Sequence, residues 1–107
     1  MYVGNYNSEN KKSGIGILYN SKNKKIYAGR FVDDKRDGTG IAFFPENKIR
    51  YEGQWRNDLK HGQGISYYKT GHNKYEGHYK YGKFDGQGSC YNREGQLVSK
   101  GFWEDGI

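Results

Sequence analysis

One pattern of aromatic residues and glycines recurs along the chain at a nearly constant interval. The segment YEGQWRNDLKHGQG at 51–64 is followed by YEGHYKYGKFDGQG at 75–88, which keeps both its opening and its close. Aromatic-x-Gly-x-aromatic begins at Tyr2, Tyr27, Tyr51 and Tyr75, and a degraded copy has Ser99, Gly101 and Trp103. Gly-x-Gly pairs lie between these copies, at 14/16, 38/40, 62/64 and 86/88. A fixed period of this kind is typical of repeat proteins, in which stacked copies of a small unit bury a continuous core.

Each unit is predicted to form a β-hairpin. The alternation aromatic-x-Gly-x-aromatic has the period of a strand, so both rings and the glycine should lie on one face. A polar loop is expected at 56–61, then a second strand that starts with Gly-x-Gly, and a second polar loop at 69–73. Repeated glycines and β-branched residues oppose a helix. The expected fold class is all-β, an elongated single-layer antiparallel sheet about 40 Å long.

The glycines of the Gly-x-Gly pairs are expected to receive aromatic rings. Glycine inside a strand costs about 0.5–1 kcal/mol relative to alanine, so its recurrence needs a compensating reason. A missing side chain leaves a notch in which a ring can lie flat. We therefore expect Gly62 and Gly64 to accept Tyr51, Trp55 or a ring of an adjacent unit.

The repeat resembles the MORN repeat family, whose unit has the form YEGxWxxGxxHGxGxxxx. Residues 51–64 and 75–88 match this form closely, residues 27–40 fairly well and residues 2–16 more loosely. The single domain then divides into units at about 1–25, 26–49, 50–73 and 74–97, with a partial unit at 98–107. Some positions depart from the family form. His61 keeps the family histidine, and Ser13, Asp37 and Asp85 replace it; Asn20 and Asn92 stand where Phe44 and Tyr68 keep an aromatic.

The resemblance implies a non-enzymatic interaction module. MORN modules are known as protein–protein interaction and dimerisation scaffolds in cytoskeletal, ciliary and membrane-contact assemblies, and binding of acidic phospholipids has been proposed for them. The chain is therefore expected to be a scaffold in a larger intracellular assembly, with a protein partner and with no cofactor.

Residues that could support chemistry do not form an active-site pattern. His61, His72 and His78 occupy different parts of the unit, and Cys90 takes a strand position shared with Leu18, Ala42 and Ser66, so a metal site is not expected. The Gly-x-Gly pairs precede no helix start and no Walker lysine, which excludes a phosphate-binding loop of that type. Tyrosines interleaved with lysines could stack on nucleic acid, but they recur with the hairpin period, and internal packing explains them first.

The charge of the chain leaves a second binding function open. The formal charge is +6, which favours acidic partners. Lysines gather in the first loops, so a patch for acidic lipid headgroups is the alternative function, with the candidates Lys11, Lys12, Lys22, Lys24, Lys25, Lys35 and Arg36. A single cysteine suits a reducing compartment, and no apolar run resembles a signal peptide or a transmembrane span, so an intracellular, cytoplasmic or cytoskeletal location is expected.

Two features of a single-layer sheet could recruit a protein partner. Rings that the repeat leaves bare would invite docking, and the candidates are Phe31, Phe44, Tyr51, Trp55, Tyr68, Tyr75, Tyr79 and Trp103. An open sheet also leaves edge strands with unpaired backbone groups. The edge near Trp103 could pair with a second copy of the chain, which would give a homodimer, or dock on a larger partner.

Overall fold

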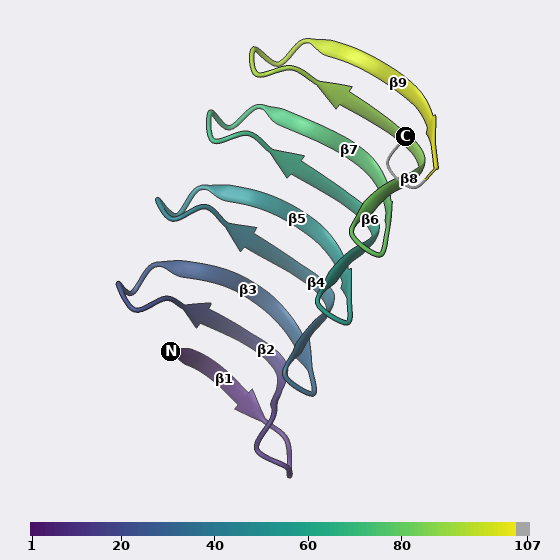
Figure 1. Cartoon of the computed structure of the whole chain (residues 1–107). Helices are drawn as coiled ribbons and strands as arrows, with labels where there is room; N and C mark the ends of the chain where they lie inside the picture. Colours follow the sequence, from purple (N-terminus) through teal and green to yellow (C-terminus); the bar gives the residue numbers. More distant parts are fainter. Residues whose placement is uncertain (105–107) are drawn as a thin grey trace.

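The computed structural model describes residues 1–104, and within them it contains nine β-strands and no helix (Figure 1). The strands are β1 (Tyr2–Tyr6), β2 (Lys12–Tyr19), β3 (Lys25–Val32), β4 (Lys35–Phe43), β5 (Ile49–Arg56), β6 (Leu59–Tyr67), β7 (Asn73–Lys80), β8 (Lys83–Tyr91) and β9 (Leu97–Trp103). Each strand pairs antiparallel with the next, in the order of the sequence. The prediction of an all-β sheet of successive hairpins is confirmed.

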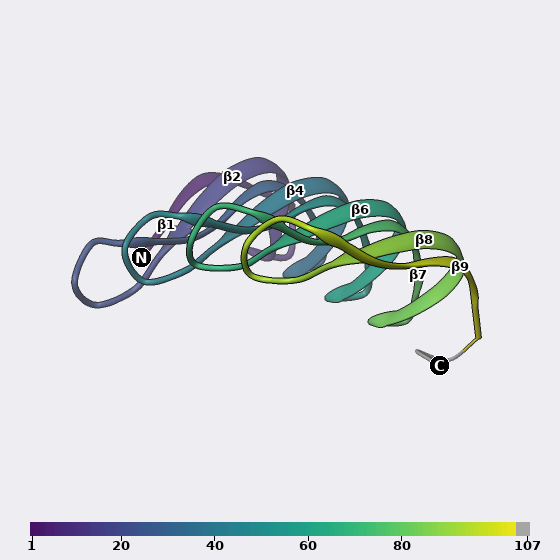
Figure 2. The ribbon, with the colours of Figure 1, turned by 90° about the horizontal axis from the view of Figure 1, so that it is seen from above.

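The sheet is an open, bent layer with principal extents of 45 × 27 × 15 Å. Its strands curve along their length, and the hairpins stack one behind the other (Figures 1 and 2). The register of every strand pair shifts once, for example between Gly53 and Trp55 and between Ser66 and Tyr67. Extra residues at such bulges bend a strand and increase its twist, which explains the curvature.

The turn between β5 and β6 is shorter than the sequence suggested. The predicted loop at 56–61 is wrong, because β5 continues to Arg56 and β6 begins at Leu59. Only Asn57 and Asp58 form the turn, with φ values of 48° and 70°. Positive φ at both central residues is the signature of a tight type I′ hairpin turn, which Asn and Asp tolerate. The longer connection spans 68–72, and the strands after such connections begin one residue before the expected unit boundaries, at Lys25, Ile49, Asn73 and Leu97.

The core lies on one side of the sheet, which we call the ring face. It consists of seven buried residues: Tyr27, Phe31, Ala42, Tyr51, Trp55, Tyr75 and Tyr79. Neighbouring rings meet edge to face, as between Tyr51 and Trp55 with centroids 5.0 Å apart, and between Tyr51 and Tyr79 at 5.3 Å. This is a preferred geometry for aromatic pairs. Successive units therefore cover one another's rings without a second sheet.

The two glycines of each Gly-x-Gly pair have different roles. A Cβ on Gly64 would clash with the phenol of Tyr51, and Gly16, Gly40 and Gly88 face Tyr2, Tyr27 and Tyr75 in the same way. The expected ring-on-glycine notch is confirmed for this second glycine. Gly62, the first of its pair, has a φ of +81° and contacts Gln54, not a ring. Its place in the repeat follows from backbone conformation, because side chains disfavour that region.

Replacing the second glycine should destabilise the fold. Gly64→Ala forces the Tyr51 ring out of its notch, and overpacking of this kind costs roughly 1–3 kcal/mol. Gly101 is also a strand glycine, the counterpart in β9 of Gly53 and Gly77, yet an added Cβ there would meet no atom within 4 Å. Gly101→Ala is therefore the matched control, with an expected change near zero. Equal losses of unfolding free energy in urea for the two variants would contradict the notch.

The buried phenols should make the fold sensitive to alkali. Burial raises the pKa of Tyr27 from 10.0 to about 12, although the nearby charge of Arg36 opposes the shift. Burial raises the pKa of Tyr51 and Tyr79 as well. A phenol with a raised folded pKa binds its proton more tightly in the fold, so its stabilisation is complete below about pH 10 and is lost as the pH rises through the folded value.

We expect the free energy of unfolding to fall between about pH 10 and pH 12, and to fall more steeply there than between about pH 7 and pH 9. Urea titrations at several alkaline pH values measure this directly, and the absorbance of the phenolate follows ionisation in the same samples. A free energy that stays constant up to about pH 12 would contradict the burial of these hydroxyls.

Candidate binding groove

Five of the eight aromatic residues predicted to meet a partner lie in the core. Phe31, Tyr51, Trp55, Tyr75 and Tyr79 are each exposed by 5% or less. That part of the prediction does not agree with the structure, because the sheet bends and neighbouring units cover these rings. These five rings are buried in the core and are not accessible to a partner.

The other three predicted aromatic residues keep accessible surface. Phe44 and Tyr68 are half-buried in the long connections that follow β4 and β6, and both line hollows in the molecular surface. Trp103 is half-buried at the far end of β9, where its indole N–H donates to the carbonyl oxygen of Gly88 at 3.4 Å. The structure thus brings Phe44 and Tyr68 together and leaves Trp103 apart from them.

Phe44 and Tyr68 belong to a surface that we call the basic groove. It comprises two adjoining hollows of about 350 Å³ each, which share Phe44, Tyr67 and Lys74. The residues that give it its chemistry are Phe44, Arg50, Lys60, Tyr68, Lys69, Lys74, Phe84 and Arg93. Lys60 lies near the tight turn of its hairpin, whereas Arg50 and Lys74 lie near the long connections. Strand curvature brings the two ends of the hairpins to one hollow.

The basic groove is lined by five cations, and no carboxylate among residues 1–104 lines either hollow. The ammonium of Lys60 lies 5.1 Å from the ring centroid of Tyr51 and 5.7 Å from that of Tyr79. Lys74 and Arg93 lie 5.9 and 5.6 Å from the ring of Tyr68. Cation–π contacts of this kind hold the positive charges in place without neutralising them.

The charged form of Lys60 is disfavoured by its surroundings in the groove. Burial lowers the pKa of its ammonium below the ordinary value, and the positive charges of Arg50 and Lys74 lower it further. Both causes disfavour the charged form. A negative group placed in the hollow would stabilise the charged form of Lys60 against both causes, so the groove is electrostatically suited to an anion.

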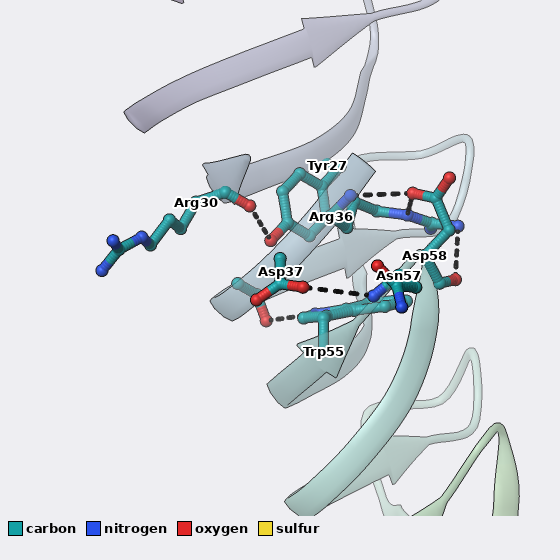
Figure 3. Close-up of polar contacts among 8 residues, drawn as sticks. Tyr27, Arg30, Arg36, Asp37, Trp55, Asn57 and Asp58 are labelled. Carbon is teal, nitrogen blue, oxygen red and sulfur yellow. Dashed lines mark hydrogen bonds and ion pairs between the residues drawn. The ribbon is translucent and has the colours of Figure 1, made fainter. Parts of the chain in front are cut away.

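Neighbouring units are tied together by the tight turns on the same side of the sheet. The backbone N–H of Arg36 donates to Oδ1 of Asp58 at 2.8 Å, and its guanidinium donates to the same Oδ1 from Nε at 3.1 Å (Figure 3). The guanidinium also lies 4.4 Å from the ring centroid of Trp55. The N–H of Asn57 donates to Asp37 at 3.3 Å. The turn of one hairpin is thereby fixed to the preceding one.

The same tie recurs with other residues. The N–H of Lys12 donates to Oδ1 of Asp34 at 2.7 Å, and the Lys12 ammonium lies 3.9 Å from that oxygen. His61 takes the place of Asp37, because its Nδ1 accepts the N–H of Tyr81 at 3.3 Å. The aspartate and the histidine that the sequence shows at this position therefore serve one purpose, which is to accept a backbone donor from the next turn.

Comparison with protein-family models finds the MORN repeat at residues 27–47, 51–73 and 75–96, more than half of the chain. The chain belongs to the MORN repeat family. MORN repeats are generally associated with binding to proteins or membrane lipids, and the family is generally non-catalytic. Comparison with curated proteins gave no significant match.

Three of the seven cations predicted to bind lipid take part in the packing between MORN units. Arg36 and Lys12 are held by Asp58 and Asp34. The backbone N–H of Lys25 donates to Asn47 at 3.1 Å, and its ammonium lies 5.7 Å from the ring centroid of Phe43. The remaining candidates are Lys11, which is half-buried, and Lys22, Lys24 and Lys35, which are exposed. The structure does not gather the seven into one patch.

Sequence reasoning missed the groove cations Arg50, Lys60, Lys69, Lys74 and Arg93. They lie in the third and fourth MORN units, away from the lysines of the first loops. A signal was present in the repeat, because Lys12 and Arg36 are followed at one fixed spacing by Asp34 and Asp58. At the same spacing, Lys60 is followed by Gly82. The spacing becomes informative only in the structure, where each tight turn lies against the preceding hairpin and brings Asp34 to Lys12 and Asp58 to Arg36.

Two observations concern the residue types that most often carry out chemistry. Within residues 1–104, no three His, Cys, Asp or Glu side chains come together as a metal ion would require. Burial raises the pKa of the Cys90 thiol, which disfavours the nucleophilic thiolate. The part of the chain that the structure describes also has no helix suited to crossing a membrane.

Proposed function

We propose that this MORN repeat chain is a non-enzymatic scaffold, a subunit or adaptor of a larger intracellular assembly, that holds a protein partner in the basic groove. The observation that carries the proposal is the set of five cations around Phe44 and Tyr68, with no carboxylate lining the hollows in residues 1–104. Arginine and aromatic side chains are enriched at protein interfaces, and a groove of one charge attracts an oppositely charged partner.

The rigidity of the groove supports this function. Its floor is the ring face, where Tyr51 and Tyr79 are fully buried, and its walls belong to hairpins tied by backbone hydrogen bonds such as Gly82 N–H to the Lys60 carbonyl at 2.8 Å. Tyr68 is fixed as well, since its hydroxyl donates to the carbonyl of Tyr91 at 2.8 Å. A preorganised surface loses little conformational entropy on binding.

The outer edge of β9 is a second place for protein pairing, and there we propose self-association. In the inner units the residue before the second ring covers the first glycine of the next strand, as Arg30 covers Gly38 and His78 covers Gly86. Phe102 is the equivalent residue of β9 and is 78% exposed, because no further strand follows among the described residues. An antiparallel pair of two β9 edges would cover both copies of Phe102.

Binding to acidic phospholipid remains the alternative function, and the exposed lysines of the first long loop favour it. Lys22 and Lys24 line a separate hollow with Pro45 and Glu46, away from the basic groove. Lipid binding through these loop lysines should weaken steeply with salt, whereas docking that includes the Phe44 and Tyr68 rings should persist.

Charge reversal in the groove should abolish capture of a protein partner. We expect the double variant Lys74→Glu/Arg93→Glu to lose a partner that the immobilised full chain retains from a cell extract, because it places repulsion at the centre of the surface. Lys22→Glu/Lys24→Glu changes the net charge equally outside the groove and is the matched control. Equal loss of partner capture in both variants would contradict the proposed function. Loss of capture only in the control, together with loss of its binding to phosphatidylserine vesicles, would also contradict it.

A charge on the β9 edge should prevent self-association. We expect the full chain to show a mass that rises with concentration in light scattering, and the Phe102→Lys variant to stay at 12.4 kDa. Ile15→Lys, which replaces another exposed apolar residue on an inner strand, is the control and should behave as the unmodified chain. A monomeric mass for the unmodified chain at all concentrations would overturn the edge pairing.

A further inference from the structure

We infer that the basic groove contains a receptor site for one carboxylate, centred on Lys60, and that the ligand is an acidic segment of the partner protein. This inference rests on the proposed function and names the chemistry that the groove would recognise. Three units have a cation at the same position of the repeat, namely Lys12, Arg36 and Lys60. In the first two units this cation has a carboxylate partner, whereas in the third unit Gly82 takes the place of the carboxylate.

The first two units show how this position treats a carboxylate. Asp34 and Asp58 each approach from the tight turn of the following hairpin and accept a backbone N–H, from Lys12 at 2.7 Å and from Arg36 at 2.8 Å. Each also lies beside the side-chain cation of that same residue, at 3.9 and 3.1 Å. A backbone donor and a cation that converge on one oxygen form a charge-assisted site for a carboxylate.

The third unit keeps the cation and lacks the carboxylate. Lys60 takes the place that Arg36 has one repeat earlier, and Gly82 takes the place of Asp58. The turn itself is preserved, since the N–H of Gly82 donates to the Lys60 carbonyl at 2.8 Å, as the N–H of Asp58 donates to the Arg36 carbonyl at 3.0 Å. Among residues 1–104, no carboxylate lies within ion-pair distance of Lys60. The missing side chain leaves its space open to solvent.

The surroundings of Lys60 favour a ligand that is more than a single ion. The hollow that Lys60 and Gly82 line also contains Arg50, Lys74 and the ring of Phe84, and it continues past Phe44 to Lys69 and Arg93. At the position of Arg50, the second unit has Ile26, so this density of charge is particular to the third and fourth units. A peptide with several acidic residues matches these cations, and its apolar side chains can contact Phe44 and Phe84.

The test supplies the missing carboxylate from within the chain. Gly82→Asp restores the residue found at the equivalent positions 34 and 58, and its φ of +86° is close to the 70° that Asp58 adopts. A Cβ at this position would meet only Leu59, at 3.8 Å, so the substitution fits. Gly82→Asn is the matched control, because asparagine has the same shape, tolerates the same backbone conformation and has no charge.

A hexaglutamate peptide is the probe, and the side-chain NMR resonances of Lys60 in the full chain are the readout. In the unmodified chain and in Gly82→Asn, we expect the peptide to shift these resonances in a saturable way. In Gly82→Asp, the apparent affinity should fall by at least about fivefold, because the internal carboxylate occupies the site. Lys60→Met, which keeps a long side chain over the two rings, should lose peptide binding to a similar extent, as measured by titration calorimetry, because this variant has no Lys60 resonances.

Three results would overturn the site. One is a peptide that leaves the Lys60 resonances unmoved, and another is an equal loss of affinity in the aspartate and asparagine variants. The third is a response to a different anion: phosphatidylserine vesicles or inorganic phosphate shift the Lys60 resonances, Gly82→Asp weakens that shift, and hexaglutamate has no effect. If Gly82→Asp does not fold, Lys60→Met decides, and peptide affinity unchanged in that variant would also overturn the site.

The outcome is separable from that of the proposed function. Capture of a cellular partner that is lost in Lys74→Glu/Arg93→Glu but fully retained in Gly82→Asp leaves the scaffold function in place and excludes the carboxylate site. Binding of hexaglutamate at Lys60 without any captured partner supports the site and counts against the scaffold function.

Discussion

The fold depends on one contact, in which a tyrosine ring lies over a glycine of the next strand. Tyr51 covers Gly64 in this way, and its hydroxyl donates to the carbonyl of Gln54 at 2.9 Å, so a fully buried phenol has its hydrogen bond satisfied locally. The contact allows a thin sheet to bury large rings. Because each ring also meets the ring of the next unit edge to face, hairpins that could not fold alone stabilise one another.

The tight turns convert the stack of hairpins into a rigid body. At each turn the chain meets the preceding hairpin through a backbone hydrogen bond, and in two units an aspartate adds a charged contact, as Asp58 does with Arg36 (Figure 3). The same place on the third unit has Lys60 without a carboxylate. Small changes at one repeated position therefore exchange a structural contact for a binding surface while the hairpin remains intact.

The regularity of the repeat and the irregularity of its charges have separate consequences. Aromatic residues and glycines recur because packing requires them at every unit, so they say little about which partner is bound. Cations at Arg50, Lys74 and Arg93 do not recur throughout, and they gather over two units only. Groove chemistry is thus particular to two units of this chain, whereas the architecture of the units is that of the MORN repeat family.

The sequence by itself determined the fold class, the antiparallel order of hairpins and the ring over Gly64, because strand alternation inside a constant longer repeat permits few other structures. Tertiary structure alone decided which rings are accessible. Trp55 and Tyr68 look equivalent as aromatic residues, yet strand curvature buries Trp55 in the core and leaves Tyr68 at the groove. Curvature also joins Lys60 to Lys74 across the ring face, a proximity set by bulges and turns that local sequence patterns do not encode.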